Sequence, residues 1–190
     1  MLPLGRYSLH EPLGFGGTAT VHLGVGGGPA GFARPVAIKR LHPRLAHDPE
    51  CIVALLEEAR LAARVQHANV VATLEVLIER GEPMIVLELT RGVAWSKVWS
   101  KLARAKHRVD PSVGCALVVG LLSGLQAVHE VVDEAGEPLG LVHRDGSPQN
   151  VIVGAGGILG SAVMIHATGT DEFCAGACHE RGGMSIPAQE

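Results

Sequence analysis

The chain has no excess of basic residues. Its 190 residues include 16 Lys and Arg against 19 Asp and Glu, which gives a formal net charge of -3. Nucleic acids and anionic membrane surfaces are bound by clustered Lys and Arg. The charge therefore indicates no nucleic-acid partner.

A targeting signal and a long apolar run are also missing from the pattern. The first residues lack the basic region and apolar stretch of a signal peptide. The most apolar run, Val113 to Leu125, is shorter than the roughly 20 residues that span a bilayer. We therefore expect a cytoplasmic protein with no membrane segment, in which this run forms a buried helix.

Cysteine is scarce, since the chain has only four. They are too few and too scattered for a disulfide framework. Cys51 and Cys115 fall in predicted helices, and we expect both in the core. Cys174, Cys178 and His179 lack a second ligand pair at zinc-finger spacing, so we interpret them as a chance cluster and not a metal site.

What the chain does have is apolar residues, at 47%, which predict a packed core. Its first ninety residues alternate β-prone runs with glycine-rich turns. They predict strands over residues 20–25, 35–40, 70–78 and 84–89, with a helix from Asp48 to about Gln66. A turn signal at residues 80–83 predicts that the last two strands form an antiparallel pair.

The second half of the chain has helical patterns. Residues 95–106 form a basic amphipathic segment, and Asp110 precedes a proline and an apolar run to about Val132. A turn-rich link then leads to a short strand at residues 151–153. The sequence thus predicts an α+β protein whose second part is mostly α.

Two stretches contain residues suited to phosphate chemistry. Glycines between Leu13 and Val21 allow close backbone approach to phosphate oxygens, and Lys39 on the next predicted strand offers a point charge. Alone, such a turn is more often an ordinary hairpin. Farther along, Asp145 and Asn150 share one loop, where a carboxylate can accept a proton and an amide oxygen suits magnesium.

In this order the motifs resemble the protein kinase family, and the bacterial serine/threonine kinases in particular. The signatures are a glycine-rich loop, a lysine in Val-Ala-Ile-Lys, and His-Arg-Asp followed five residues later by asparagine. The resemblance implies a bilobal fold. Residues 1–92 would form a five-stranded antiparallel sheet with one helix and the hinge, and residues 93–153 a partial, mainly α lobe. Residues 154–190 would be an atypical, poorly ordered tail.

The resemblance also implies an activity and its residues. The reaction would be transfer of the γ-phosphoryl group from ATP, with Mg²⁺, to serine or threonine of a protein substrate. Glu58 would hold Lys39, Asp145 would be the base, and Asn150 a magnesium ligand. Without the resemblance, Glu57 and Glu58 are more readily two solvated acids on the polar face of the helix. The residues implied to contact ATP are Leu13, Gly14, Phe15, Gly16, Gly17, Thr18, Ala19, Val21, Ala37, Lys39, Leu87, Glu88 and Leu89.

The sequence departs from the family pattern at three points. Ala19 replaces the third glycine of the loop, and Ser147 stands where many members carry a lysine. After Val153 no Asp-Phe-Gly occurs, and Asp171 is the nearest acid in the tail. We expect that truncation or a frameshift replaced the original continuation. Three possibilities stay open: an active kinase, an ATP-binding module without catalysis, and a non-functional fragment.

Overall fold

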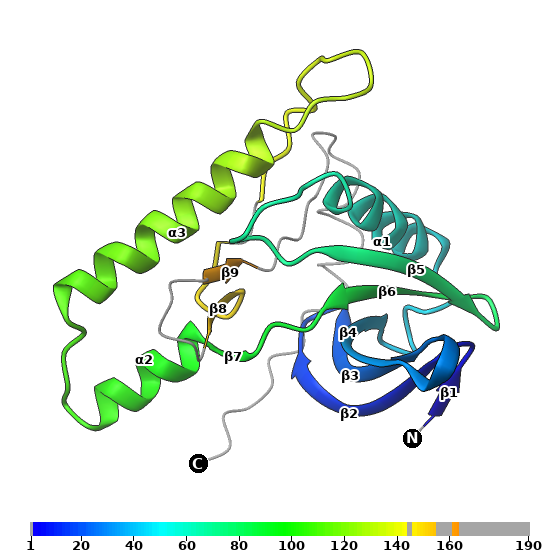
Figure 1. Ribbon diagram of the computed structural model, residues 1–190, viewed down its shortest axis with the longest axis horizontal. Coiled ribbons are helices and arrows are strands. Elements are labelled where there is room, and N and C mark those ends of the chain that lie inside the picture. Colours follow the sequence, from blue (N-terminus) through cyan, green and yellow to red (C-terminus); the bar gives the residue numbers. More distant parts are fainter. Residues whose placement is uncertain (1, 144–145, 155–160, 164–190) are drawn as a thin grey trace. The chain divides into compact units, whose positions relative to one another are not determined.

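The computed structural model describes residues 2–143, 146–154 and 161–163, and its elements are shown in Figure 1. The chain divides into two compact units. One contains the described residues up to Leu56 together with Glu75–Leu87, and the other contains Glu57–Leu74 and the described residues from Glu88 onward. The boundaries predicted from the sequence, after residues 92 and 153, stay predictions.

The first large element is a six-stranded sheet in the order β1-β2-β3-β4-β6-β5. The four strands predicted by residue range are present as β3 to β6, the fifth strand implied by the resemblance is β2, and one short edge strand, β1, joins them. Pairing is antiparallel between β1 and β2, β2 and β3, and β3 and β4. The bounds are β1 Leu2–Leu4, β2 Tyr7–Phe15, β3 Ala19–Gly27, β4 Ala33–Leu41, β5 Thr73–Glu79 and β6 Glu82–Glu88.

The β5–β6 connection confirms the predicted antiparallel pair. Only Arg80 and Gly81 separate the two strands, and both have positive φ, 54° and 83°. A two-residue turn with positive φ at both positions is type I′, whose twist matches that of a β-hairpin. The glycine fits because it has no Cβ to oppose this conformation.

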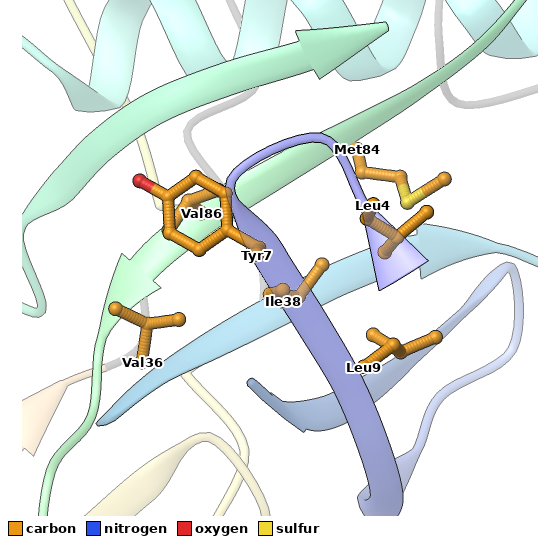
Figure 2. Close-up of a cluster of buried hydrophobic side chains, with 7 residues drawn as sticks. All are labelled: Leu4, Tyr7, Leu9, Val36, Ile38, Met84 and Val86. Carbon is orange, nitrogen blue, oxygen red and sulfur yellow. The ribbon is translucent and has the colours of Figure 1, made fainter. Parts of the chain in front are cut away.

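One face of the sheet carries a hydrophobic cluster (Figure 2). Figure 2 shows its side chains converging from β1, β2, β4 and β6: Leu4, Tyr7, Leu9, Val36, Ile38, Met84 and Val86. Strand β3 contributes no side chain to the cluster, and Gly24 lies opposite Val36 in the register. A Cβ at Gly24 would come within 2.5 Å of Ile38 Cδ1, so Ile38 occupies the space that a β3 side chain would need.

The sheet is curled, as Figure 1 shows. Strands β2 and β5 are not neighbours in the sheet order, yet the Tyr7 hydroxyl donates a 2.6 Å hydrogen bond to Glu75 Oε2. The Arg6 guanidinium also pairs with this carboxylate. The Tyr7 hydrogen bond, followed by the Arg6 contacts, lowers the pKa of Glu75, while partial burial opposes the shift. These contacts stabilise the curl.

Helix α1, Pro49–Ala62, begins where the sequence predicts. Asp48 Oδ1 accepts a hydrogen bond from the Glu50 amide at 3.0 Å, which satisfies one of the free donors at the helix start. The helix ends before the expected Gln66, and the next residues form turns, in which the Arg64 amide bonds the Leu61 carbonyl.

The second unit contains two helices and a small sheet. Helix α2 is Trp95–Arg104 and α3 is Pro111–His129, whose N-cap Asp110 accepts a 2.8 Å hydrogen bond from the Ser112 amide. Both helices end slightly earlier than predicted. The sheet has the order β7-β8-β9, with antiparallel pairing throughout. Its strands are β7 Gly92–Ala94, β8 Val151–Gly154 and β9 Ser161–Val163.

Strand β9 lies inside the region predicted to be a poorly ordered tail. It pairs with β8, so that Val151 lies opposite Val163 and Val153 opposite Ser161. The regular pattern therefore continues past Val153. The other residues of the predicted tail, 155–160 and 164–190, lie outside the described residues, and with them Asp171, Cys174, Cys178 and His179.

The prediction of a buried helix at Val113 to Leu125 is wrong. Val118, Val119 and Leu122 are more than half exposed, and Cys115, expected in the core, is exposed as well. Only a narrow stripe of α3 is buried, namely Gly120, Gly124 and Val128, which recur every four residues on one side of the helix. Val128 packs in a cluster with Val65, Val70, Val131 and Leu141.

The expectation of no membrane segment rested on the shortness of the apolar run Val113 to Leu125. Helix α3 is longer than this run. The helix has 19 residues, and an 18-residue stretch of it has a mean hydropathy of 1.7, which is enough in length and composition to cross a bilayer. An apolar core helix of a soluble protein meets the same criteria of length and composition. Of the apolar 18-residue stretch of α3, 17% is buried. Length and composition alone therefore do not assign α3 to a membrane.

Substituting Gly24 tests the close packing of β3 against β4. In Gly24→Ala the new Cβ meets both Ile38, which is fully buried, and Val36 at 3.0 Å. We expect the free energy of unfolding to fall by roughly 1–3 kcal/mol, as overpacked cores do. The matched control is Gly17→Ala, whose Cβ meets nothing within 4 Å. Equal unfolding midpoints in urea for the two variants would contradict this packing.

The Glu75 contacts predict a pH dependence of stability. The folded-state pKa of Glu75 lies below its ordinary value of 4.5. The stabilisation is therefore present above pH 4.5 and is lost as the pH falls below it through the folded-state pKa. In Tyr7→Phe, which removes the main cause of the shift, melting temperature measured from pH 6 to about 3 should fall less steeply than in the wild type.

Candidate functional site

Three predicted site residues lie in one row across the sheet. In the strand register Gly14 of β2 is opposite Val21 of β3, and Val21 is opposite Lys39 of β4. Directly opposite residues of an antiparallel pair project from the same face. The register therefore brings part of the glycine-rich segment, an apolar side chain and the ammonium group together.

Ala37 belongs to the same face. It lies two residues before Lys39, and side chains along a strand alternate between faces with a period of two. Val36 and Ile38, the residues between, belong to the hydrophobic cluster on the other side. The sheet thus separates an apolar core face from a face that carries four of the residues implied to contact ATP.

Lys39 is buried, with only 4% of its surface exposed. Lysine is almost never this buried unless its charge is compensated, because removing an ammonium group from water is costly. A buried lysine beside a glycine-rich hairpin is suited to hold an anionic group. Its surroundings on the sheet face, Ala37 and Val21, are apolar or small.

The glycine-rich hairpin closes tightly between β2 and β3. Gly16, Gly17 and Thr18 connect the strands, and the Gly16 amide donates a 2.8 Å hydrogen bond to the Ala19 carbonyl. Ala19 is buried, consistent with the small residue that the sequence places there. Phe15, at the tip of β2, is 76% exposed. The hairpin therefore presents backbone and one aromatic ring to solvent.

The end of β6 contains the predicted hinge residues. Val86 is fully buried, Leu87 is half-buried and Glu88 is exposed. The Glu88 amide already donates a 2.9 Å hydrogen bond to the Ala72 carbonyl. A main-chain contact from Glu88 to an adenine edge would therefore use its carbonyl oxygen. Leu89, the next predicted hinge residue, is half-buried.

The two acids of α1 differ in exposure. Glu58 is half-buried and Glu57 is exposed, as expected for neighbours that point about 100° apart on a helix. Of the two, Glu58 is the one whose partial burial suits a partner of a buried cation. Its predicted role toward Lys39 stays a prediction.

The predicted catalytic loop is described on both sides of its central residues. Arg144 and Asp145 lie outside the described residues, whereas His143 before them is only 4% exposed. After them, the Asn150 amide bonds the Ser147 carbonyl at 3.0 Å. The Pro148 carbonyl accepts a 3.0 Å hydrogen bond from the Ser96 amide at the start of α2. The loop is thus anchored before and after Asp145.

Sequence reasoning missed His42, which directly follows β4. Its Nε2 atom lies 2.9 Å from the Gly16 carbonyl, and its amide donates a 2.9 Å hydrogen bond to the Thr18 carbonyl. The predicted strand ended at Arg40, so nothing in the pattern indicated that the chain beyond it returns to the hairpin. Only the register of β3 with β4 brings the two together.

A dedicated metal cluster is not found in the described part of the chain. There, no three or more His, Cys, Asp or Glu side chains are grouped to hold an ion. Asn150 is half-buried at the end of the anchored loop, and its amide oxygen suits a hard cation such as Mg²⁺. Among the described residues of the predicted site, Asn150 is therefore one that could hold such a cation.

Comparison with known proteins agrees with this geometry. The family model "Protein kinase domain" matches residues 7–161. The chain is 37% identical over 149 residues to the tyrosine-protein kinase MasK of Myxococcus xanthus, covering 78% of this chain and 23% of that protein. It is 34% identical over 155 residues to the serine/threonine-protein kinase PkaB of Streptomyces coelicolor, covering 82% and 33%.

A further relative is the serine/threonine-protein kinase PknL of Mycobacterium tuberculosis, with 30% identity over 148 residues, 78% of this chain and 33% of that protein. The chain spans about a quarter to a third of the length of these relatives. The family match also ends at residue 161, in β9, and not at Val153 where the sequence resemblance had been placed. From the match and the identities, the chain belongs to the protein kinase family.

Proposed function

We propose that the chain binds Mg-ATP through the sheet face that carries Lys39, and that it encodes transfer of the γ-phosphoryl group to a protein serine or threonine. The observation that carries the proposal is the row Gly14, Val21 and Lys39. It sets a buried ammonium group beside a hairpin whose exposed backbone can approach phosphate oxygens. Family membership supplies the reaction type.

The contacts to ATP divide between the strands and the hinge. Val21 and Ala37 cover the adenine with apolar surface, and the Glu88 carbonyl accepts from its edge. Lys39 places its charge on the phosphates, and Glu58 holds Lys39. The hairpin residues Gly14 to Ala19 enclose the phosphates, with backbone amides as donors other than that of Gly16, which bonds the Ala19 carbonyl.

The transfer step needs one proton acceptor and charge stabilisation. Asp145 accepts the proton of the substrate hydroxyl. The oxygen of that hydroxyl forms a bond to the γ-phosphorus, and the bond from the γ-phosphorus to the β–γ bridging oxygen breaks, which leaves ADP. Asn150 would supply an amide oxygen to hold Mg²⁺. When bound there, the ion would neutralise the charge that develops on the phosphate oxygens.

The acceptor residue is proposed to be serine or threonine. The relatives include serine/threonine kinases and a tyrosine kinase: PkaB and PknL are named as the former and MasK as the latter. The partner is accordingly a protein substrate, with the reaction placed in the cytoplasm. Phosphotyrosine as the product would overturn the choice of hydroxyl and leave ATP binding intact.

A second candidate function is nucleotide binding without transfer. It is favoured by the sequence after Val153, where no Asp-Phe-Gly occurs among residues 154–190. In the family this aspartate binds the metal between the β- and γ-phosphates. Loss of such charge stabilisation costs several kcal/mol, and each ~1.4 kcal/mol lowers the rate about tenfold.

Thermal unfolding tests the nucleotide site. A ligand at about 100 times its Kd stabilises the folded state by ~2.7 kcal/mol, so Mg-ATP should raise the melting temperature. Lys39→Met should remove most of this rise, because the phosphates lose their cation. Lys97→Met, at an exposed lysine on α2, is the matched control and should keep it. No rise in the wild type would refute nucleotide binding.

Radiolabel transfer separates the two candidate functions. With γ-labelled ATP and a generic basic protein, an active kinase labels serine or threonine, and Asp145→Asn should lower the rate by at least about a hundredfold. Nucleotide-induced stabilisation should survive in Asp145→Asn, since this residue acts on the hydroxyl. Binding without any labelling by the wild type would establish the second candidate.

A further inference from the structure

The segment that follows β4 contacts three successive carbonyls of the glycine-rich hairpin. His42 Nε2 lies 2.9 Å from the Gly16 carbonyl, and the His42 amide donates to the Thr18 carbonyl at 2.9 Å. Arg44 Nη2 lies 3.5 Å from the Gly17 carbonyl between them, the weakest of the three contacts. Residues 42–44 therefore engage the carbonyl side of the whole turn.

The chemistry of the partners determines which ring nitrogen of His42 carries a hydrogen in the contact with Gly16. A carbonyl oxygen only accepts hydrogen bonds, so Nε2 carries the hydrogen in the contact with Gly16. Nδ1 lies 3.4 Å from Thr20 Oγ1, a hydroxyl that can donate to it.

Peptide geometry turns these contacts into an orientation of the amides. Within a planar trans peptide unit the carbonyl of one residue and the N–H of the next point in opposite directions. The described chain has no cis peptide bond. With the carbonyls of residues 16–18 directed at residues 42–44, the N–H groups of Gly17, Thr18 and Ala19 point away from that segment. Successive N–H groups that share a direction form an anion-binding concavity.

We propose that His42 is a positioning residue that holds the hairpin carbonyls and thereby aims the amides of Gly17 and Thr18 at the phosphate groups of the nucleotide. The proposal rests on the proposed function for its ligand. The orientation of the hairpin does not require a bound ligand, so it can be measured in the free protein. A Cβ at Gly17 would meet nothing within 4 Å, so the turn is unobstructed at this residue.

A purely structural role for His42 would give a different result. The ring could serve only to close the end of the β3–β4 pair, in which case its loss would lower stability and weaken every ligand of the site alike. A positioning role acts through the phosphates. The distinguishing quantity is therefore the ratio of the Kd for ATP to the Kd for adenosine, which has no phosphate.

The experiment uses the full chain as wild type, His42→Ala, His42→Gln and His47→Ala. His47 is an exposed histidine nearby in the sequence and is the matched control. A glutamine side chain can donate an N–H to the Gly16 carbonyl and should restore the contact in part. Two measurements are made: amide hydrogen exchange by NMR without ligand, and calorimetric titration with ATP and with adenosine.

In His42→Ala we expect the Gly16 amide, which bonds the Ala19 carbonyl, to exchange roughly fivefold faster, the effect of one hydrogen bond of ~1 kcal/mol. The Kd for ATP should rise by about tenfold while the Kd for adenosine stays unchanged. His42→Gln should lie between, and His47→Ala should match the wild type.

Unchanged Gly16 exchange in both His42 variants would overturn the proposal, as would an equal loss of affinity for adenosine and ATP. If the wild type binds neither ligand, the proposed function fails, and the exchange rates alone decide whether His42 holds the hairpin. Should His42→Ala not fold, His42→Gln, which keeps a donor, supplies the same comparison.

Discussion

The register of strands β2, β3 and β4 is the constraint on which the site depends. It places Gly14 opposite Val21 and Val21 opposite Lys39, on the face of the sheet away from the hydrophobic cluster. A shift of one residue would move every side chain of a strand to the other face. Lys39 would then enter the apolar core and Ile38 would leave it. The burial that stabilises the sheet therefore also positions the ammonium group.

Two kinds of contact hold strands β2, β3 and β4 and their hairpin in place. On the core face, Gly24 leaves room for Ile38, which locks β3 against β4 by packing. At the hairpin, His42 and the residues after it hold the loop by hydrogen bonds to its carbonyls. Packing fixes which face Lys39 occupies, and hydrogen bonds fix how the loop faces solvent. A glycine-rich loop is flexible by composition, so a tether of this kind limits the entropy that a bound phosphate must remove.

Much of this arrangement could be predicted from the sequence because it is encoded locally. Runs of β-prone residues indicated β3 to β6, Asp48 and Asp110 marked the starts of α1 and α3, and the ordered motifs indicated the family, whose fold implied β2. The misses have non-local causes. The exposure of α3 depends on what covers it, and an apolar composition does not reveal that. The contact of His42 with Gly16 depends on strand pairing, and β9 has too few residues to give a periodic signal.

The central claim is that the Lys39 face of the sheet, with its hairpin, receives the phosphates of ATP. The most direct measurement is an NMR titration of the full chain with Mg-ATP, following the backbone amides and the Lys39 Nζ resonance. The account predicts saturable shifts at Gly17, Thr18 and Lys39 Nζ, with little change at Val36 and Ile38 on the core face. Saturable shifts that leave Gly17, Thr18 and Lys39 unaffected, or no shifts at millimolar nucleotide, would contradict it.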